Sequence, residues 1–266
     1  IIFAFDECTS PTEDLKYQKE ALERTHRWAE RSLKEHLKLI SSAGEKEKVS
    51  LAGSLYSQER PLPNLPLTKG EEKGGGPALF GIVQGGREES LRKESAKIIS
   101  EMQIDGKGFD GFGIGGSFAK EDIHTAVRWV NEILPEEKPR HLLGIGEPED
   151  LFMGIENGVD LFDCVIPTRL GRNGTIFTKY GKIIMTNTRF RNNYSPIEED
   201  CECYSCKNYS KSYIAHLFHG KEMLAGTLAS IHNLYFIVNL VKKIRQSILD
   251  ESFFEFKDEF FKNYKK

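Results

Sequence analysis

Short apolar segments alternate with longer amphipathic segments along most of the chain. Short apolar runs predict buried strands, and apolar positions spaced about 3.6 residues apart predict helices that cover them. The expected strands are residues 1–5, 78–83, 109–115, 141–146 and 159–167, and the expected helices are residues 12–40, 88–102, 123–133 and 148–157. This alternation is typical of parallel βα units in an α/β fold.

The number of strands limits the fold. A closed (β/α)8 TIM barrel needs eight strands, and the chain begins at Ile1 inside an expected strand. We therefore expect that N-terminal strands of the barrel are absent from this chain. An open doubly wound sheet is the alternative, because its βα rhythm is the same. Both folds place functional groups just after the carboxyl ends of strands, which here are Asp6, Gln84, Gly115, Gly116, residues 144–150 and Asp163.

Other parts of the chain depart from this rhythm. Residues 41–77 are rich in Gly, Ser, Lys, Glu and Pro, and we expect a flexible insertion there. The C-terminal sequence FFEFKDEFFKNYKK predicts an amphipathic helix whose Phe stripe packs into a core. The expected domains are residues 1–190 (C-terminal part of the barrel), 191–240 (a metal-binding subdomain) and 241–266 (helices packing on the barrel).

Composition and charge exclude some classes of protein. Apolar residues make up 39% of the 266 residues, and the net charge is −3. We find no apolar run of roughly 18 residues and no signal peptide, so we expect a cytoplasmic protein without a membrane span. The overall charge does not predict a nucleic-acid binder, but Arg169, Arg172, Lys179 and Lys182 form a local basic segment.

Three of the five cysteines lie close together, in the sequence DCECYSC. Cys201, Cys203 and Cys206 can converge on one ion, and Zn²⁺ prefers four tetrahedral sulfur or nitrogen ligands. Spacing alone leaves His216, His219 and His232 open as the fourth ligand. A site of three cysteines and one histidine has no open position for water, so we expect one structural zinc ion per subunit.

Several motifs occur together and in order: FDEC, FGIVQGG, GFGIGG, GIGEPED, DLFDCVIPTRLGRNG, the three-cysteine pattern and IHNLYF. In this combination the chain resembles the bacterial-type tRNA-guanine transglycosylases, also called queuine tRNA-ribosyltransferases. The resemblance runs from Ile1 to the C-terminus, apart from residues 41–77. It implies a TIM barrel with a zinc subdomain, a homodimer, and replacement of the wobble guanine in tRNAs with GUN anticodons (Asp, Asn, His, Tyr) by a 7-deazaguanine base, a queuosine precursor.

The resemblance also implies roles for individual residues. The nucleophile is Asp163, which would hold the ribose covalently. The base-binding residues are Asp6, Gln84, Gly115 and Gly116, and the zinc ligands are Cys201, Cys203, Cys206 and His232. The RNA-binding residues are Gly144, Ile145, Gly146, Glu147, Pro148, Glu149, Asp150, Thr168, Arg169, Leu170, Gly171 and Arg172.

The chemistry is consistent with these roles. A carboxylate can attack C1′ of the ribose, and two successive displacements retain the anomeric configuration. Asp163 lies in an expected buried strand, where a carboxylate is costly unless it is paired or used. A structural carboxylate satisfied by a neighbouring arginine is the alternative. The Asp6 carboxylate can accept from a guanine edge, while Gln84 and the Gly116 N–H can donate to its carbonyl.

Two departures from the family pattern limit this interpretation. The family's Asp-Ser-Gly-Gly-Phe-Gln motif, with its proposed general acid/base, is not in these 266 residues, and we expect it upstream of Ile1. If it is missing, the alternative is a non-catalytic zinc-containing tRNA-binding subunit that partners an active homologue. Residues 117–121 read SFAKE where the bacterial pattern has Leu-Ala-Val-Gly-Glu, in the segment that selects the incoming base. Aminomethyl-deazaguanine is the expected base, with queuine as the alternative.

Overall fold

The computed structural model describes residues 1–10, 12–46, 76–116 and 123–264. The chain divides into two compact units, Ile1–His141 and Leu142–Lys266. Residues 47–75 of the expected insertion and the SFAKE segment lie outside the described residues. The expected domain boundaries at residues 190 and 240 fall inside the second unit and stay predictions.

A parallel sheet forms the centre of the first unit. Strands β1 (Ile2–Phe3), β2 (Leu79–Val83) and β3 (Gly111–Ile114) are parallel neighbours in chain order. Strand β4 (Arg140–Leu142) lies where this unit ends. All residues of β2 and β3 are buried, which explains why both are continuously apolar and do not alternate. The predicted α/β class with parallel βα units is confirmed.

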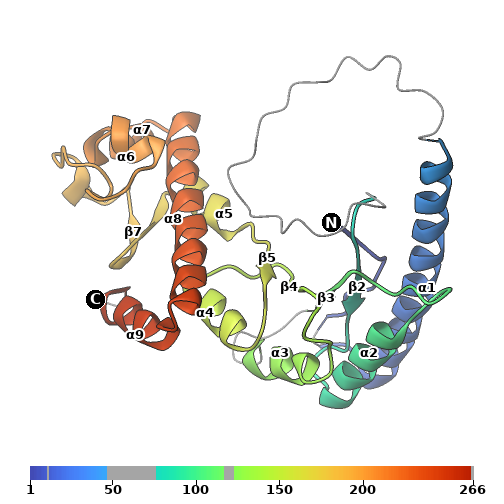
Figure 1. The fold of residues 1–266 in the computed structure, drawn as a ribbon. Helices are drawn as coiled ribbons and strands as arrows, with labels where there is room; N and C mark the ends of the chain where they lie inside the picture. The colour runs from blue at the N-terminus through green and yellow to red at the C-terminus, as the bar shows by residue number, and fades with distance from the viewer. Residues whose placement is uncertain (11, 47–75, 117–122, 265–266) are drawn as a thin grey trace. The chain divides into compact units, whose positions relative to one another are not determined.

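Three helices belong to the first unit. They are α1 (Leu15–Lys46), α2 (Glu89–Glu101) and α3 (Ile123–Asn131), and Figure 1 shows α1 and α2 side by side. The prediction that α1 ends near residue 40 is wrong, because the helix continues through the first six residues of the expected insertion. Ser41 and Ser42 donate hydrogen bonds to the carbonyls of Leu37 and Leu39, so their side chains are satisfied within the helix.

The second unit begins with α4 (Pro148–Glu156), β5 (Leu161–Phe162) and α5 (Ile166–Arg172). The strand expected over residues 159–167 is therefore mostly wrong. Only two residues form β5, and a helix follows because Pro167 suits the first turn, where no N–H is needed. The hairpin of β6 (Thr175–Thr178) and β7 (Gly181–Ile184) was not predicted, because its strands are short and only partly apolar.

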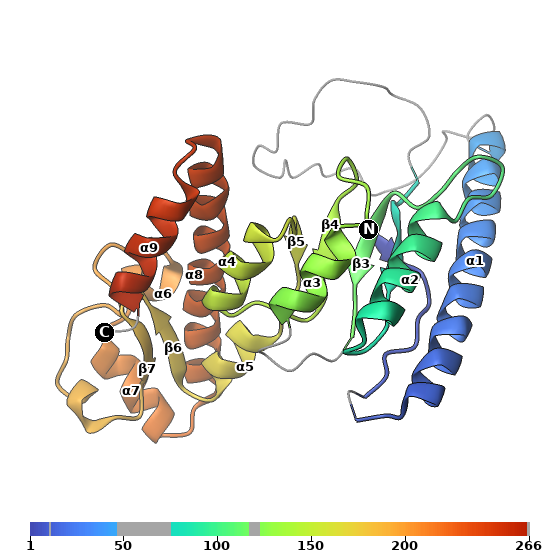
Figure 2. The same ribbon diagram turned by 90° about the horizontal axis from the view of Figure 1, so that it is seen from below.

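Helix α8 (Met223–Leu249) is the central element of the second unit. Helices α6 (Tyr204–Asn208), α7 (Lys211–His219) and α9 (Phe253–Tyr264) all contact it, as do α4 and α5, and Figure 2 shows α4 and α9 beside it. A short 3-10 turn, η2 (Thr188–Phe190), precedes α6. The predicted core packing of the Phe stripe is confirmed: Phe253, Phe256, Phe260 and Phe261 of α9 pack with Leu240 and Ile244.

Among the described residues, α8 is also the single helix long and apolar enough to cross a membrane, judged by length and composition. The expectation of no such segment rested on unbroken apolar runs, whereas α8 combines apolar residues with a few polar ones. Two of those polar residues, His232 and Asn233, are fully buried. Asn233 accepts from the backbone N–H of Phe177 and donates to the carbonyls of Pro167 and Thr175, so this face of α8 packs inside the unit.

Candidate active site and metal centre

The first unit brings together the residues expected to bind a base. Asp6 follows β1, Gln84 directly follows β2, and Gly115 and Gly116 follow β3, so all four lie at the carboxyl ends of neighbouring parallel strands. Gln84 is 3% exposed and its Nε2 donates a 2.6 Å hydrogen bond to Asp6 Oδ2. A carboxylate can only accept, so this bond fixes which end of the Gln84 amide faces Asp6.

The amide of Gln84 differs from the sequence expectation in one respect. We expected Gln84 to act as a donor to a base carbonyl, but one of its N–H groups already serves Asp6. Its Oε1 is buried and, among the described residues, has no hydrogen-bond partner. The group therefore offers a buried acceptor as well as its second amide N–H, and a buried unsatisfied oxygen of this kind favours a ligand that donates to it.

Both glycines after β3 lie close to the side chains of the base-binding group. A Cβ on Gly115 would lie 2.6 Å from Gln84 Nε2, and one on Gly116 would lie 2.2 Å from Arg92 Nη2. Gly116 also has φ +116°, which side-chain-bearing residues rarely adopt. The conformation of Gly116 therefore requires glycine, and a Cβ at either position would displace the Gln84 or Arg92 side chain.

Arg92 of α2 was not among the residues predicted for the site. Its side chain is fully buried, and it donates from Nε to the carbonyl of Gly86 (2.8 Å) and from Nη1 to the carbonyl of Gly115 (2.6 Å). Burial lowers the pKa of its guanidinium to about 9, so it keeps its charge at neutral pH. A signal was present in the sequence, because Arg92 shares the buried face of α2 with Leu91, Ser95, Ala96 and Ile99 at helical spacing.

Helix α1 contacts Glu7, the residue that follows Asp6. Arg24 forms a bidentate pair with Glu7, at 2.6 and 2.9 Å, and Tyr17 donates its hydroxyl to Glu7 Oε1. The hydrogen bonds from Arg24, followed by that from Tyr17, lower the pKa of the Glu7 carboxyl to about 2. The backbone N–H of Glu7 donates to Thr25 Oγ1 at 3.0 Å. The segment that carries Asp6 is thus fixed to α1.

Asp163 lies in the second unit, directly after β5. The expectation that it is buried is wrong: its side chain is exposed, because β5 is only two residues long and half-buried. Its Oδ1 accepts a 3.1 Å hydrogen bond from the backbone N–H of Gly144. Gly144 has φ +73° and open space around the Cβ position, so its conformation alone requires glycine. Asp160, three residues earlier, is also exposed.

The residues expected to bind RNA form two different structures. The segment 144–150 leads into α4, with Gly146, Pro148 and Asp150 buried. The segment 168–172 is part of α5, a helix that the sequence did not predict. Gly171 is buried there, and a Cβ on it would lie 2.8 Å from the backbone of Ser230 in α8. Helix packing therefore explains Gly171, while Arg169 and Arg172, three residues apart on α5, are exposed.

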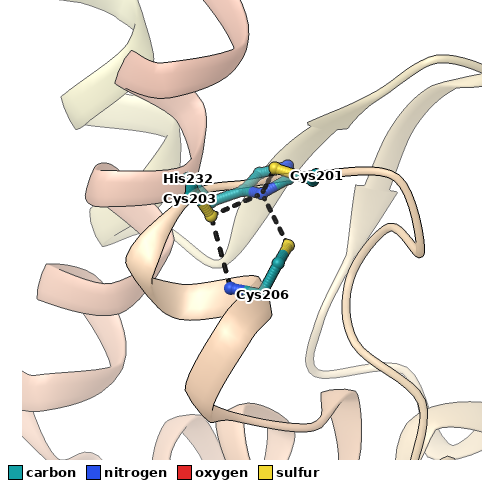
Figure 3. A group of neighbouring side chains, drawn as sticks. All are labelled: Cys201, Cys203, Cys206 and His232. Carbon is teal, nitrogen blue, oxygen red and sulfur yellow. Dashed lines mark hydrogen bonds between the residues drawn. The ribbon is translucent and has the colours of Figure 1, made fainter.

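The metal centre is the most compact group in the second unit. Cys201, Cys203, Cys206 and His232 each point one ligand atom to a common centre, and these atoms lie within 4.8 Å of one another (Figure 3). The three sulfurs lie 3.7, 3.5 and 3.3 Å from His232 Nδ1. Tetrahedral zinc with Zn–S of about 2.3 Å and Zn–N of about 2.0 Å would separate sulfur and nitrogen by about 3.5 Å. The donor set therefore fits zinc.

The structure also selects the histidine. His232 is fully buried, whereas His216 and His219 are exposed on α7. His232 Nε2 lies 2.8 Å from the carbonyl of Phe177, so this nitrogen carries the proton and Nδ1 faces the sulfurs as an acceptor. Hydrogen bonds from Cys201 and Cys206 hold the pKa of the Cys203 thiol well below its usual range, and the thiolate is the form that binds a metal.

Comparison with known proteins identifies the family. A family model described as queuine tRNA-ribosyltransferase matches residues 1–266. The chain belongs to this family. Curated relatives named queuine tRNA-ribosyltransferase come from a Thermoanaerobacter species (43% identical), Streptococcus sanguinis (39%) and Pediococcus pentosaceus (38%). Each match covers 99% of this chain and 60% of the relative.

Membership of the queuine tRNA-ribosyltransferase family confirms the resemblance drawn from the motifs. The chain spans about 60% of the length of these relatives, and the described parallel strands make up part of a barrel sheet. The candidate site lies in two groups, one in each unit: the Asp6–Gln84 group in the first, and Asp163 with the metal centre in the second.

Proposed function

We propose that the full-length protein is a tRNA-guanine transglycosylase, a cytoplasmic pentosyltransferase of queuosine biosynthesis. It exchanges the wobble guanine of tRNAs with GUN anticodons for a 7-deazaguanine base, with aminomethyl-deazaguanine as the expected substrate. The observation that carries this proposal is the hydrogen bond from buried Gln84 to half-buried Asp6, at the carboxyl ends of two neighbouring parallel strands in a chain of this family.

This pair has the polarity that a guanine-like edge requires. Asp6 can accept from the ring N–H and the exocyclic amine, while the N–H of Gly116 and the second N–H of Gln84 can donate to the carbonyl. Gln84 is buried and Gly116 half-buried, so an analogue without these groups would leave buried polar atoms unpaired. That penalty would give the site its specificity for guanine-like bases.

Asp163 is the proposed nucleophile. Its carboxylate attacks C1′ of the ribose, the C1′–N9 bond breaks, and guanine leaves with the electron pair and takes up a proton. The ring nitrogen of the incoming base then attacks C1′, loses its proton and displaces the carboxylate, so the configuration is retained. The Gly144 N–H donates to Oδ1 of Asp163, which orients the carboxylate before the substrate arrives.

The exposed arginines of α5 are the proposed phosphate contacts. Arg169 and Arg172 both lie on α5, which begins three residues after Asp163. Phosphates bound to these arginines would therefore set the position of the anticodon nucleotide relative to Asp163. The wobble base must leave its stack to reach the pocket. Lys182, by contrast, pairs with Glu147 at 2.8 Å, which ties the hairpin to the segment 144–150. This contact supports a structural role for Lys182.

Zinc would be held by Cys201, Cys203, Cys206 and His232. With four protein ligands it leaves no position for water, so it supplies folding stability to the second unit and no reaction chemistry. We also propose a homodimer that uses this region, where the Tyr204 and Tyr213 side chains are 56% and 40% exposed, because aromatic residues are enriched at protein interfaces. Light scattering on the purified protein would test the dimer.

Transfer of radiolabelled guanine into tRNA tests the proposed reaction. In the full-length protein, Asp163→Asn is expected to abolish exchange and leave tRNA binding within about twofold, because only the nucleophile is lost. Asp160→Asn is the matched control, since Asp160 is exposed three residues earlier and has no proposed role.

Undiminished exchange in Asp163→Asn would overturn the assignment of the nucleophile. A wild-type protein that binds tRNA but exchanges no base, alone, would instead support a non-catalytic tRNA-binding subunit. Adding an active family member then decides whether the chain acts as its partner.

A further inference from the structure

Arg92 joins the two glycine turns at the base-binding group. The side chain extends from α2 and contacts the carbonyl of Gly86, after β2, and the carbonyl of Gly115, after β3. It is fully buried, so it does not itself form the pocket surface. Its own backbone is part of the same arrangement, because a Cβ on Gly85 would lie 2.7 Å from Arg92 N.

The bond to Gly115 has a consequence for the next residue. The carbonyl of Gly115 and the N–H of Gly116 belong to one planar peptide unit, in which they point in opposite directions. By holding the Gly115 oxygen at 2.6 Å, Arg92 therefore fixes the direction of the Gly116 N–H. A cationic donor on the carbonyl also polarises the peptide, which makes its N–H a better donor on the other side.

We propose that Arg92 is a positioning residue that aims and polarises the Gly116 N–H toward the carbonyl of the bound base. The inference deepens the proposed function and rests on it, since Gly116 is the expected donor to that carbonyl. Arginine is needed because its planar fork reaches two carbonyls at once, through Nε and Nη1. Lysine keeps the charge, but its three N–H donors share one nitrogen, so it does not reproduce the separation of Nε and Nη1 that lets Arg92 contact both turns.

The test compares Arg92→Lys with Arg140→Lys in the full-length protein. Arg140 is the matched control, because it is also buried in the first unit and donates to a backbone carbonyl, that of Leu134, at 2.8 Å. Guanine exchange gives KM for guanine, KM for tRNA and kcat. Inhibition by 2-aminopurine, which lacks the 6-carbonyl, gives the affinity for a base that cannot use the Gly116 donor.

We expect Arg92→Lys to raise KM for guanine about tenfold or more, the loss expected for one well-oriented hydrogen bond to a buried donor. The inhibition constant of 2-aminopurine should change less than about twofold, whereas the KM for tRNA should also rise, because the wobble guanine carries the same carbonyl. Arg140→Lys should change none of the three. An unchanged KM for guanine, an equal loss for both bases, or the same loss in Arg140→Lys would overturn the proposal.

Amide hydrogen exchange distinguishes failure of this inference from failure of the proposed function. If the wild-type protein exchanges no base, the proposed function fails, and the positioning role is judged on the turns alone. Arg92→Lys should then speed amide exchange at Gly86 and Gly116 relative to both wild type and Arg140→Lys. Equal protection in all three proteins would mean that Arg92 does not hold these turns.

Discussion

The metal centre and the base-binding group are built in opposite ways. Three of the four metal ligands lie within six residues, and the fourth lies on the helix that packs against them. Asp6 and Gln84, by contrast, are 78 residues apart and meet only because β1 and β2 are paired in parallel. The spacing of residues in the sequence can therefore predict a metal site. A pocket formed by strand ends can be recognised only when the pairing of the strands is known.

The two regions also differ in what holds them. Coordination to one ion would hold the metal centre, so its stability depends on a component that can be removed. The base-binding group is held by hydrogen bonds from Arg92 to backbone carbonyls. Its close packing is possible because Gly85, Gly115 and Gly116 have no side chains. Disturbing a metal ligand should therefore unfold a region, while disturbing a glycine should strain one turn.

The largest expected effect is loss of the metal. Cys203→Ser, or treatment with a strong chelator, should abolish zinc binding and unfold the metal region of the second unit, because structural zinc contributes on the order of 10 kcal/mol in small sites. Metal analysis and amide exchange of α6–α8 measure the change. Cys8→Ser, an exposed cysteine of the first unit, is the control and should keep the full zinc content. Retained folding without zinc would remove the contrast between the two regions.

An intermediate effect is expected at Gly85. Its φ is +131°, and a Cβ there would meet backbone atoms of Leu91 and Arg92 at 2.7–2.8 Å, so Gly85→Ala should destabilise the first unit by about 2–4 kcal/mol. Gly106→Ala is the matched control, with φ +74° and open space, and should cost about 1 kcal/mol. Urea unfolding compares them. Equal costs would show that the close approach contributes nothing.

The smallest expected effect is electrostatic. Glu7 has its pKa lowered to about 2 in the folded state, below its ordinary value of 4.5. Its contribution to stability is therefore complete above pH 4.5 and is lost as the pH falls toward 2. Glu7→Gln should remove this part of the pH dependence of Tm, a change of no more than about 4 °C. Glu30→Gln, at an exposed position of α1, should leave the wild-type profile unchanged.

Most elements of the alternating part could be predicted from the sequence, and particular residues show why others could not. Buried strands such as β2 are visible as unbroken apolar runs. Helix α5 was taken for the end of a strand and a loop, because its apolar start and its glycines fit several structures. The packing of α5 against α8, where Gly171 lies close to Ser230, supports the helix. The burial of Asp163 was overestimated because an apolar sequence does not reveal how long the strand is.

The sequence by itself determined the family, the parallel βα order and three candidate metal ligands, because motifs, apolar runs and short spacings act over a few residues. Only the tertiary structure decided that His232 faces the thiols, that Gln84 donates to Asp6, and that Arg92 joins the turns after β2 and β3. Each of these contacts joins residues 6 to 78 positions apart. Their direction depends on which face of a helix is buried and where a strand ends, and both are settled by packing.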